Sequence, residues 1–327
     1  MLKSRKFRLI LGLALVILLV LSVGCTAKKE APKEAPKASY PSKEVEIAYH
    51  SKAGSGGDIF LRAMGKSVEQ ALGKPIVVNN LPGAAGATAW THVQKAKPDG
   101  HILLGVSSTI ITAPLLNPMP VTYKDFEPIA MMFTDPMVIF VPEKSPFKTL
   151  KDLVDAAKKN PDKLKIAGGT PGELGFVAGR ELMKAANIKF ALVPFEGGGD
   201  AAVTVLGGHL DAGIGEYAEI AASVEAGKLR IIVAFNKMPL KPEIPVVADA
   251  GYPQIKVEKL RGLVAPKGTP PEIIDKLVAV MKTCYDNPEF KKYYEANNLI
   301  PNFKAKGEFM KVMDEQNNQV KEAIAVK

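Results

Sequence analysis

The chain has 327 residues and a formal net charge of +9, and hydrophobic residues make up 47% of it. Four cations, Lys3, Arg5, Lys6 and Arg8, lie at the N-terminus, so the rest of the chain is only mildly basic. It has no cluster of lysines and arginines interleaved with aromatic residues, which argues against nucleic-acid binding.

The N-terminus has the pattern of an export signal. The basic residues precede an apolar run over residues 9–21, which is shorter than the roughly 20 residues that a membrane-spanning helix needs. Ser22-Val23-Gly24-Cys25 then resembles a bacterial lipobox, in which Cys25 is lipidated and becomes the first mature residue. Ser22 departs from the usual leucine, so ordinary signal cleavage and an uncleaved anchor stay open as alternatives. We predict a signal peptide over residues 1–24.

A charged, low-complexity segment follows, and it has no hydrophobic face to bury. We predict that residues 25–43 contain the lipidated Cys25 and a flexible tether. The mature domain is therefore expected outside the cytoplasm, anchored to the membrane as a lipoprotein. The second cysteine, Cys284, is expected to be a buried apolar residue of a helix, because it has no partner within the mature domain.

The first glycine-rich turn, residues 51–58, is the most informative stretch of the mature chain. It follows an alternating strand with Val45, Ile47 and Tyr49, and it precedes an amphipathic helix. Backbone N–H groups at a helix N-terminus attract anions. We therefore expect an anion-binding loop, most simply for a carboxylate. The alternative is a plain strand-to-helix connection capped by Asp58.

Beyond this loop, short apolar strands alternate with amphipathic helices. One helix is expected to begin at the Thr149–Asp152 capping box and to end near Lys159. Such alternation predicts an α/β fold with mostly parallel sheets flanked by helices. Five strand ends carry glycine, serine, threonine or acidic residues. They lie in both halves of the chain, so a cleft between two lobes would bring them together.

Signals for catalysis are weak. The four histidines lack a metal-ligand spacing, and the chain has neither a G-x-S-x-G nucleophile elbow nor a Walker phosphate loop. The carboxylates of Asp58, Glu173, Asp200 and Glu216 could pair as acid and base, but their spacing does not require it. We expect no enzymatic activity, no cofactor and no metal.

Seven blocks of sequence, in order, resemble the periplasmic solute receptors of tripartite tricarboxylate transporters, the Bug-type or TctC-like family. The blocks are AGSGGD at 53–58, VVNNLPGAAG at 77–86, KPDGH at 97–101, VPFEG at 193–197, LGGHLD at 206–211, AGKLR at 226–230 and APKGTPP at 265–271. The resemblance extends from about Tyr40 to the C-terminus.

The resemblance implies a type II Venus-flytrap fold with two α/β lobes. Residues 44–140 with 262–327 would form lobe I, and residues 141–261 would form lobe II. It also implies a monomeric receptor that holds a small carboxylate or amino acid in the cleft and delivers it to an integral-membrane permease. An alternative is a sensing module that presents its ligand to a membrane sensor kinase, and an exported enzyme acting on carboxylates is a weaker one.

Carried over position by position, the resemblance also predicts the ligand-binding residues. They are Ser51, Lys52, Ser55, Gly56, Gly57, Asp58, Ser107, Thr109, Thr170, Glu173, Phe195, Gly198, Glu216 and Tyr217.

Three of these positions depart from the family pattern. Glu173 replaces the start of a serine run, Phe195 replaces a tyrosine, and Glu216 replaces an asparagine. Acids that face a cleft repel carboxylate-rich ligands. We therefore expect a ligand with one or two carboxylates, or with an amino group, and Lys52 and Arg261 as compensating cations. Alternatively, the two glutamates cap helices and face solvent.

Overall fold

A computed structural model describes residues 40–195 and 198–325, and for residues 323–325 it describes the backbone alone. The expected signal peptide, Cys25 and the tether up to Ser39 lie outside this range. Tyr40 already belongs to the folded body, because its hydroxyl donates a hydrogen bond of 2.8 Å to the carbonyl of Gly100. No helix in the described part of the chain is long and apolar enough to span a membrane.

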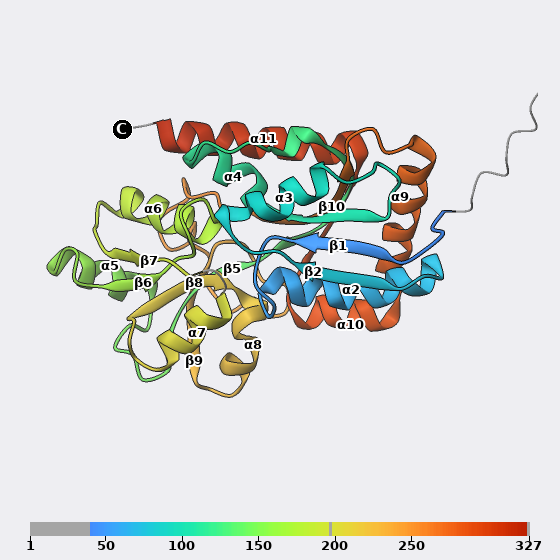
Figure 1. Ribbon diagram of the computed structural model, residues 1–327. Helices are drawn as coiled ribbons and strands as arrows, with labels where there is room; N and C mark the ends of the chain where they lie inside the picture. The colour runs from blue at the N-terminus through green and yellow to red at the C-terminus, as the bar shows by residue number, and fades with distance from the viewer. Residues whose placement is uncertain (1–39, 196–197, 326–327) are drawn as a thin grey trace, which may run out of the picture. The chain divides into compact units, whose positions relative to one another are not determined.

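The first sheet has six strands in the order β11-β4-β10-β3-β1-β2. Figure 1 labels β1, β2 and β10 of this sheet. The strands are β1 (Val45–Tyr49), β2 (Ile76–Asn80), β3 (Ile102–Ser107), β4 (Phe126–Asp135), β10 (Lys259–Pro266) and β11 (Ile300–Ala305). β1 is parallel to β2 and β3, whereas β10 is antiparallel to β3 and β4, and β11 is antiparallel to β4. This sheet defines lobe I.

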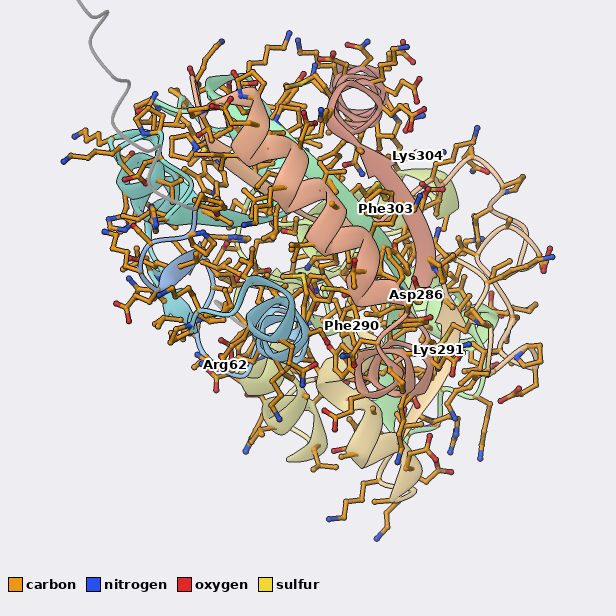
Figure 2. All side chains as sticks on the ribbon, turned by 90° about the vertical axis from the view of Figure 1, so that its right-hand side faces the viewer. Arg62, Asp286, Phe290, Lys291, Phe303 and Lys304 are labelled. Carbon is orange, nitrogen blue, oxygen red and sulfur yellow. The ribbon has the colours of Figure 1, made fainter. Side chains whose placement is uncertain are left out.

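Helices cover both faces of this sheet. The core on one face includes residues of α2 (Gly56–Leu72), α9 (Pro271–Tyr285) and α10 (Pro288–Ala296), and the core on the other includes residues of α3 (Ala87–Gln94), α4 (Thr109–Leu116) and α11 (Lys306–Ala325). Two short 3₁₀ turns, η1 (Ala84–Gly86) and η2 (Tyr123–Asp125), complete the lobe. Phe290 and Phe303 lie in its aromatic cluster (Figure 2), where the ring of Phe290 is 5.9 Å from that of Phe133. Cys284 is buried in the same core, as expected.

The helix after the first loop forms as the sequence predicts. Its apolar side chains recur at helical spacing and are buried, among them Phe60, Met64 and Val68. The helix begins after Ser55, whose hydroxyl accepts a hydrogen bond from the N–H of Asp58, so serine and not Asp58 is the N-cap. It ends at Gly73, which has a φ of 68° and supplies the left-handed conformation of the cap.

The second sheet, which defines lobe II, has five strands in the order β7-β6-β8-β5-β9. The strands are β5 (Met137–Pro142), β6 (Lys165–Ala167), β7 (Ala191–Val193), β8 (Ala212–Glu216) and β9 (Leu229–Ala234). Residues of α5 (Leu150–Lys159) and α6 (Leu174–Ala186) join the core on one face, and residues of α7 (Gly198–Leu206) and α8 (Tyr217–Glu225) join the core on the other. The expected capping box of Thr149 and Asp152 opens α5.

The chain crosses between the sheets twice, between Asp135 and Met137 and again before Lys259. Both crossings come a few residues before the boundaries expected at 140/141 and 261/262. The two-lobed α/β fold is confirmed, but each sheet is mixed and not mostly parallel. β10 enters the first sheet antiparallel to β3, and β5 enters the second antiparallel to β8, because these strands lead across from the other lobe.

Candidate ligand-binding site

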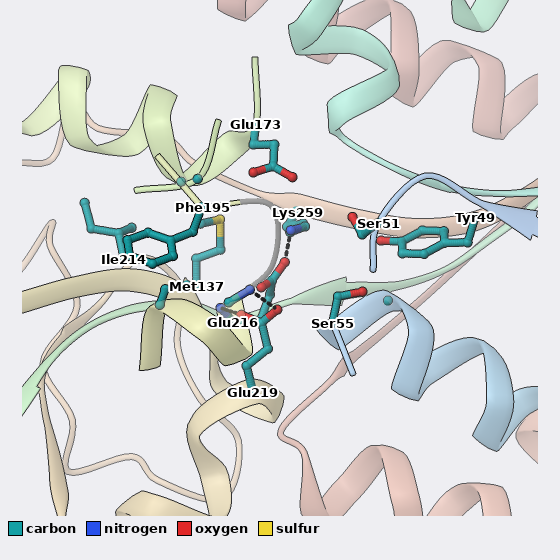
Figure 3. Close-up of a pocket in the computed structure, with 16 residues that line it drawn as sticks. Tyr49, Ser51, Ser55, Met137, Glu173, Phe195, Ile214, Glu216, Glu219 and Lys259 are labelled. Atoms are coloured by element: carbon teal, nitrogen blue, oxygen red, sulfur yellow. Dashed lines mark hydrogen bonds and ion pairs between the residues drawn. The ribbon is translucent and has the colours of Figure 1, made fainter. Parts of the chain in front are cut away.

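A cavity of about 40 Å³ lies between the two sheets (Figure 3). By the usual measure it has room for roughly one to three water molecules. Lobe I contributes the β1–α2 loop and the start of β10, and lobe II contributes the ends of its strands. The lining residues are Tyr49, Ser51, Ser55, Gly57, Met137, Gly169, Glu173, Gly175, Phe195, Gly198, Ala201, Ile214, Gly215, Glu216, Glu219 and Lys259.

The β1–α2 loop is held in shape from within. One carboxylate oxygen of Asp58 accepts a hydrogen bond of 2.9 Å from the N–H of Gly54, and the other accepts one of 2.9 Å from Nε of Arg62. Burial would raise the pKa of Asp58, but the hydrogen bonds from Arg62 and Gly54 outweigh it and lower that pKa. Asp58 is therefore a charged structural support that directs the loop towards the cavity.

The carboxylate of Glu219 lies where three backbone N–H groups converge. Oε1 accepts hydrogen bonds from Gly56 at 3.0 Å and from Gly198 at 3.2 Å, and Oε2 accepts one from the N–H of Glu216 at 3.3 Å. Gly56 opens α2 in lobe I, whereas Gly198 opens α7 in lobe II. Two helix N-termini from different lobes thus hold one carboxylate, as the positive ends of helix dipoles favour.

A buried group of charges lies beside the cavity, at the strands that cross between the lobes. Arg261 is 1% exposed and donates to Asp135 at 2.8 Å and 2.6 Å, to the hydroxyl of Tyr49 at 2.9 Å and to Glu216 at 3.3 Å. Lys259, two residues earlier on β10, forms an ion pair with the same Glu216 oxygen. We call these five residues the hinge cluster. It joins the lobes because Glu216 ends β8 of lobe II, whereas Lys259 and Arg261 belong to lobe I.

Burial changes the titration of the groups around the cavity. It raises the pKa of Glu219 to about 7, helped by the negative charges of Asp135 and Glu173 and opposed by the N–H of Gly56 and by Arg261. Burial and the charge of Arg261 lower the pKa of Lys259 to about 7. Both groups therefore titrate close to neutral pH, which makes the charge of the site sensitive to its surroundings.

Seven of the fourteen predicted site residues line the cavity. They are Ser51, Ser55, Gly57, Glu173, Phe195, Gly198 and Glu216. Glu173 and Glu216 also stand at the N-cap positions of α6 and α8. Glu216 does not face solvent, because it is only 6% exposed.

The other predicted residues lie behind or beside the cavity. Gly56 reaches it only through its N–H, and Asp58 supports the loop. The hydroxyls of Ser107 and Thr109 are buried and hydrogen-bonded to each other at 3.2 Å. Three more lie elsewhere: Thr170 lines a neighbouring pocket, Tyr217 packs in the core of lobe II, and Lys52 lies on the surface near Asp200.

Sequence reasoning missed several lining residues, notably Tyr49, Met137, Glu219 and Lys259. Met137 and Lys259 stand where the chain crosses between the lobes, and the sequence placed both crossings later. The spacing of Glu219, three residues after Glu216, is that of a capping box, and this signal would have drawn attention to it. Arg261, expected as a cation for the ligand, is instead committed to the hinge cluster. Within the described ranges, no group of histidine, cysteine and acidic residues could hold a metal ion.

Two α/β lobes with a partly polar cavity between them have the architecture of a solute-binding receptor. The family model for the tripartite tricarboxylate transporter family receptor (TctC) matches residues 60–327. The chain belongs to this receptor family, whose members are solute receptors and not enzymes. Membership implies an extracytoplasmic location.

Individual relatives agree with this assignment. A UPF0065 protein from the TAR-I ttuE-ttuC' intergenic region of Agrobacterium vitis is 29% identical over 80% of this chain and 77% of its own length. Among solved structures, a periplasmic transporter is 29% identical with a TM-score of 0.83, covering 88% of this chain and 98% of its own. The periplasmic binding protein BugD is 27% identical with a TM-score of 0.82, covering 86% and 97%.

Proposed function

We propose that this receptor captures a small carboxylate, with or without an amino group, in the cavity between its lobes. The observation that carries the proposal is the meeting of the N–H groups of Gly56 and Gly198 at one point, where they hold a carboxylate oxygen of Glu219. A site that binds one carboxylate in this way has the geometry and the electrostatics to bind the carboxylate of a ligand.

The lining of the cavity supports a ligand of modest negative charge. Glu173 and Glu216 contribute acids, and Lys259 of the opposite lobe, already paired with Glu216, contributes an amino group. A tricarboxylate would bring three negative charges next to these acids, so we propose one or two carboxylates. Phe195 and Met137 add apolar surface that suits a short aliphatic chain.

Binding is coupled to lobe closure in this proposal. The ligand enters when the lobes separate about the two crossing segments, and it is enclosed when they come together. The closed form then docks on an integral-membrane permease and delivers the ligand.

Lipidation of Cys25 keeps the receptor near that permease, so Cys25→Ala should abolish fatty-acid incorporation and membrane association. Retained incorporation in this variant would contradict the lipid anchor.

A thermal-shift titration tests the carboxylate. Acetate, succinate and L-aspartate are compared with succinamide, which has the shape of succinate but no charge. A ligand that binds only the folded form raises its stability, by about 2.7 kcal/mol at a hundred times its dissociation constant. We expect at least one carboxylate to raise Tm and succinamide to leave it unchanged.

Two glycine variants provide the matched control. A Cβ at Gly56 would lie 3.1 Å from Nη2 of Arg261 and 3.5 Å from the Glu219 side chain, whereas a Cβ at Gly307 would meet nothing within 4 Å. Gly56→Val should abolish the carboxylate-dependent rise in Tm, and Gly307→Val should retain it. A rise of wild-type size in a folded Gly56→Val protein, or no rise with any carboxylate in the wild type, would contradict the proposed function.

A further inference from the structure

The contacts of Glu219 exceed what helix capping needs. Asp152, the equivalent residue of the α5 capping box, accepts hydrogen bonds from Lys148 and Thr149, in the turn just before its own helix. Glu219 likewise accepts from its own N-cap residue, Glu216, but its other oxygen reaches the N–H of Gly56, which lies 163 residues away in the sequence and in the other lobe. Glu219 therefore makes a contact across the cleft that capping of its own helix does not require.

The surroundings of Glu219 leave no room for a second carboxylate on the same donors. A Cβ added to Gly198 would collide with the Glu219 carboxylate, so glycine at this position makes space for that group. The cavity beside it measures only about 40 Å³. Glu173 and Glu216 also line this space, and their charges would repel a further anion. The N–H groups of Gly56 and Gly198 can thus serve either Glu219 or a ligand carboxylate.

We propose that Glu219 is an internal competitor that a ligand carboxylate must displace from the N–H groups of Gly56 and Gly198. This inference rests on the proposed carboxylate-binding function and identifies the residue that sets its affinity. Only a ligand whose carboxylate outcompetes a glutamate already held across both lobes binds well. Glu219 therefore lowers the affinity for every carboxylate by a similar factor, so that only ligands with additional contacts in the cleft still bind at low concentration.

Calorimetric titration of variants tests the competition. Acetate, succinate and L-aspartate are titrated into the wild-type receptor and into Glu219→Ala, Glu219→Gln and Asp152→Ala. Because hydrogen bonds to a charged group are strong, we expect Glu219→Ala to bind the carboxylates roughly 10- to 100-fold more tightly at pH 8, where Glu219 is charged. Glu219→Gln, which keeps the shape but not the charge, should gain less. Asp152→Ala loses a capping box of the same kind far from the cavity and should bind as the wild type does.

Amide exchange shows which group occupies the two N–H donors, because a ligand carboxylate that takes the place of Glu219 protects the same amides. In protein labelled with ¹⁵N-glycine, Glu219→Ala should speed hydrogen exchange of the Gly56 and Gly198 amides, because both lose their acceptor. The amide of Gly65, in the middle of α2, is the internal reference and should not change. Adding the best-binding carboxylate should restore protection of both amides.

The results of these experiments distinguish a failure of the competition by Glu219 from a failure of the proposed carboxylate-binding function. A carboxylate that binds the wild type and Glu219→Ala equally, or binds the variant more weakly, leaves the receptor function standing and overturns the competition. Unchanged exchange of Gly56 and Gly198 in Glu219→Ala overturns it as well. If no carboxylate binds any variant, the proposed function is contradicted and the inference falls with it.

Discussion

Two sets of charged side chains join the lobes, one buried and one exposed. The hinge cluster lies beside the crossing strands, where Arg261 is 1% exposed and bonds to Asp135, Tyr49 and Glu216. At the surface, Nζ of Lys52 lies 4.0 Å from Asp200, with side chains 50% and 70% exposed. Both connect one lobe to the other, but only the buried set is removed from water. The same chemistry should therefore have very different consequences at the two places.

The buried set can be broken at its centre. Arg261→Ala leaves the carboxylate of Asp135, itself 1% exposed, without its cation, and removing one partner of a buried pair costs about 3–5 kcal/mol. We expect a loss of this size in the free energy of unfolding, measured by urea titration.

The control is Lys291→Ala, which removes an exposed ion pair with Glu295 on α10 and should cost less than about 1 kcal/mol. Replacing both Arg261 and Asp135 by apolar residues should recover part of the loss, because no buried charge is then left alone. Equal stability of Arg261→Ala and the wild type would show that the cluster does not hold the lobes.

Titration of Glu219 sharpens the comparison, because this carboxylate is charged or neutral depending on pH. Its pKa is about 7 in the folded protein and near 4.5 when unperturbed. The folded state thus binds the proton of Glu219 more tightly than the unfolded state does. This protonation therefore adds fully to the free energy of unfolding below pH 4.5, and its contribution is lost as the pH rises to about 7. Glu219→Gln cannot titrate. From pH 5 to pH 8, the free energy of unfolding of the wild type should fall relative to this variant by about 1–3 kcal/mol.

The measurement is a set of urea titrations at pH 5, 6, 7 and 8 on both proteins. Asp152→Asn is the companion variant, because Asp152 lies on the surface and hydrogen bonds from Lys148 and Thr149 lower its pKa. The difference in free energy of unfolding between Asp152→Asn and the wild type should stay the same between pH 5 and pH 8. Parallel curves for the wild type and Glu219→Gln would mean that Glu219 carries an ordinary pKa and is not enclosed between the lobes.

The sequence predicted the parts of the fold that have strong local signals. The α/β alternation, α2, the capping box of α5 and the burial of Cys284 all appear as expected. β4 and β11 were missed. Both contain a proline, at Pro128 and Pro301, and β4 is followed directly by another strand, β5, instead of by a helix. Such strands are recognised by their partners across the sheet, which a single sequence does not show.

The site was predictable only where it follows a glycine turn. The loops at Ser51–Gly57 and at Glu173 carry visible signals, and the structure brings them to one cavity. Glu219 and Lys259 reach the same cavity from inside a helix and from the start of β10, so their role depends on how the lobes meet. The same limit applies to Arg261, whose charge is plain in the sequence but whose partner, Asp135, is 126 residues away.

Breaking the exposed pair of Lys52 and Asp200 should have the smallest effect on stability. Lys52→Ala removes a charge at the rim of the cleft, and exposed pairs contribute about 0–1 kcal/mol, so its free energy of unfolding should change by no more than that. Because a rim charge acts on an approaching anion through water, affinity for succinate should fall about twofold to fivefold in low salt, and the difference should vanish near 0.5 M salt. Lys144→Ala, an exposed lysine of lobe II that does not line the cavity, is the control and should leave affinity unchanged. Succinate affinity that is equal in the wild type and Lys52→Ala at low salt would remove Lys52 from the site and leave anion recognition to the buried donors alone.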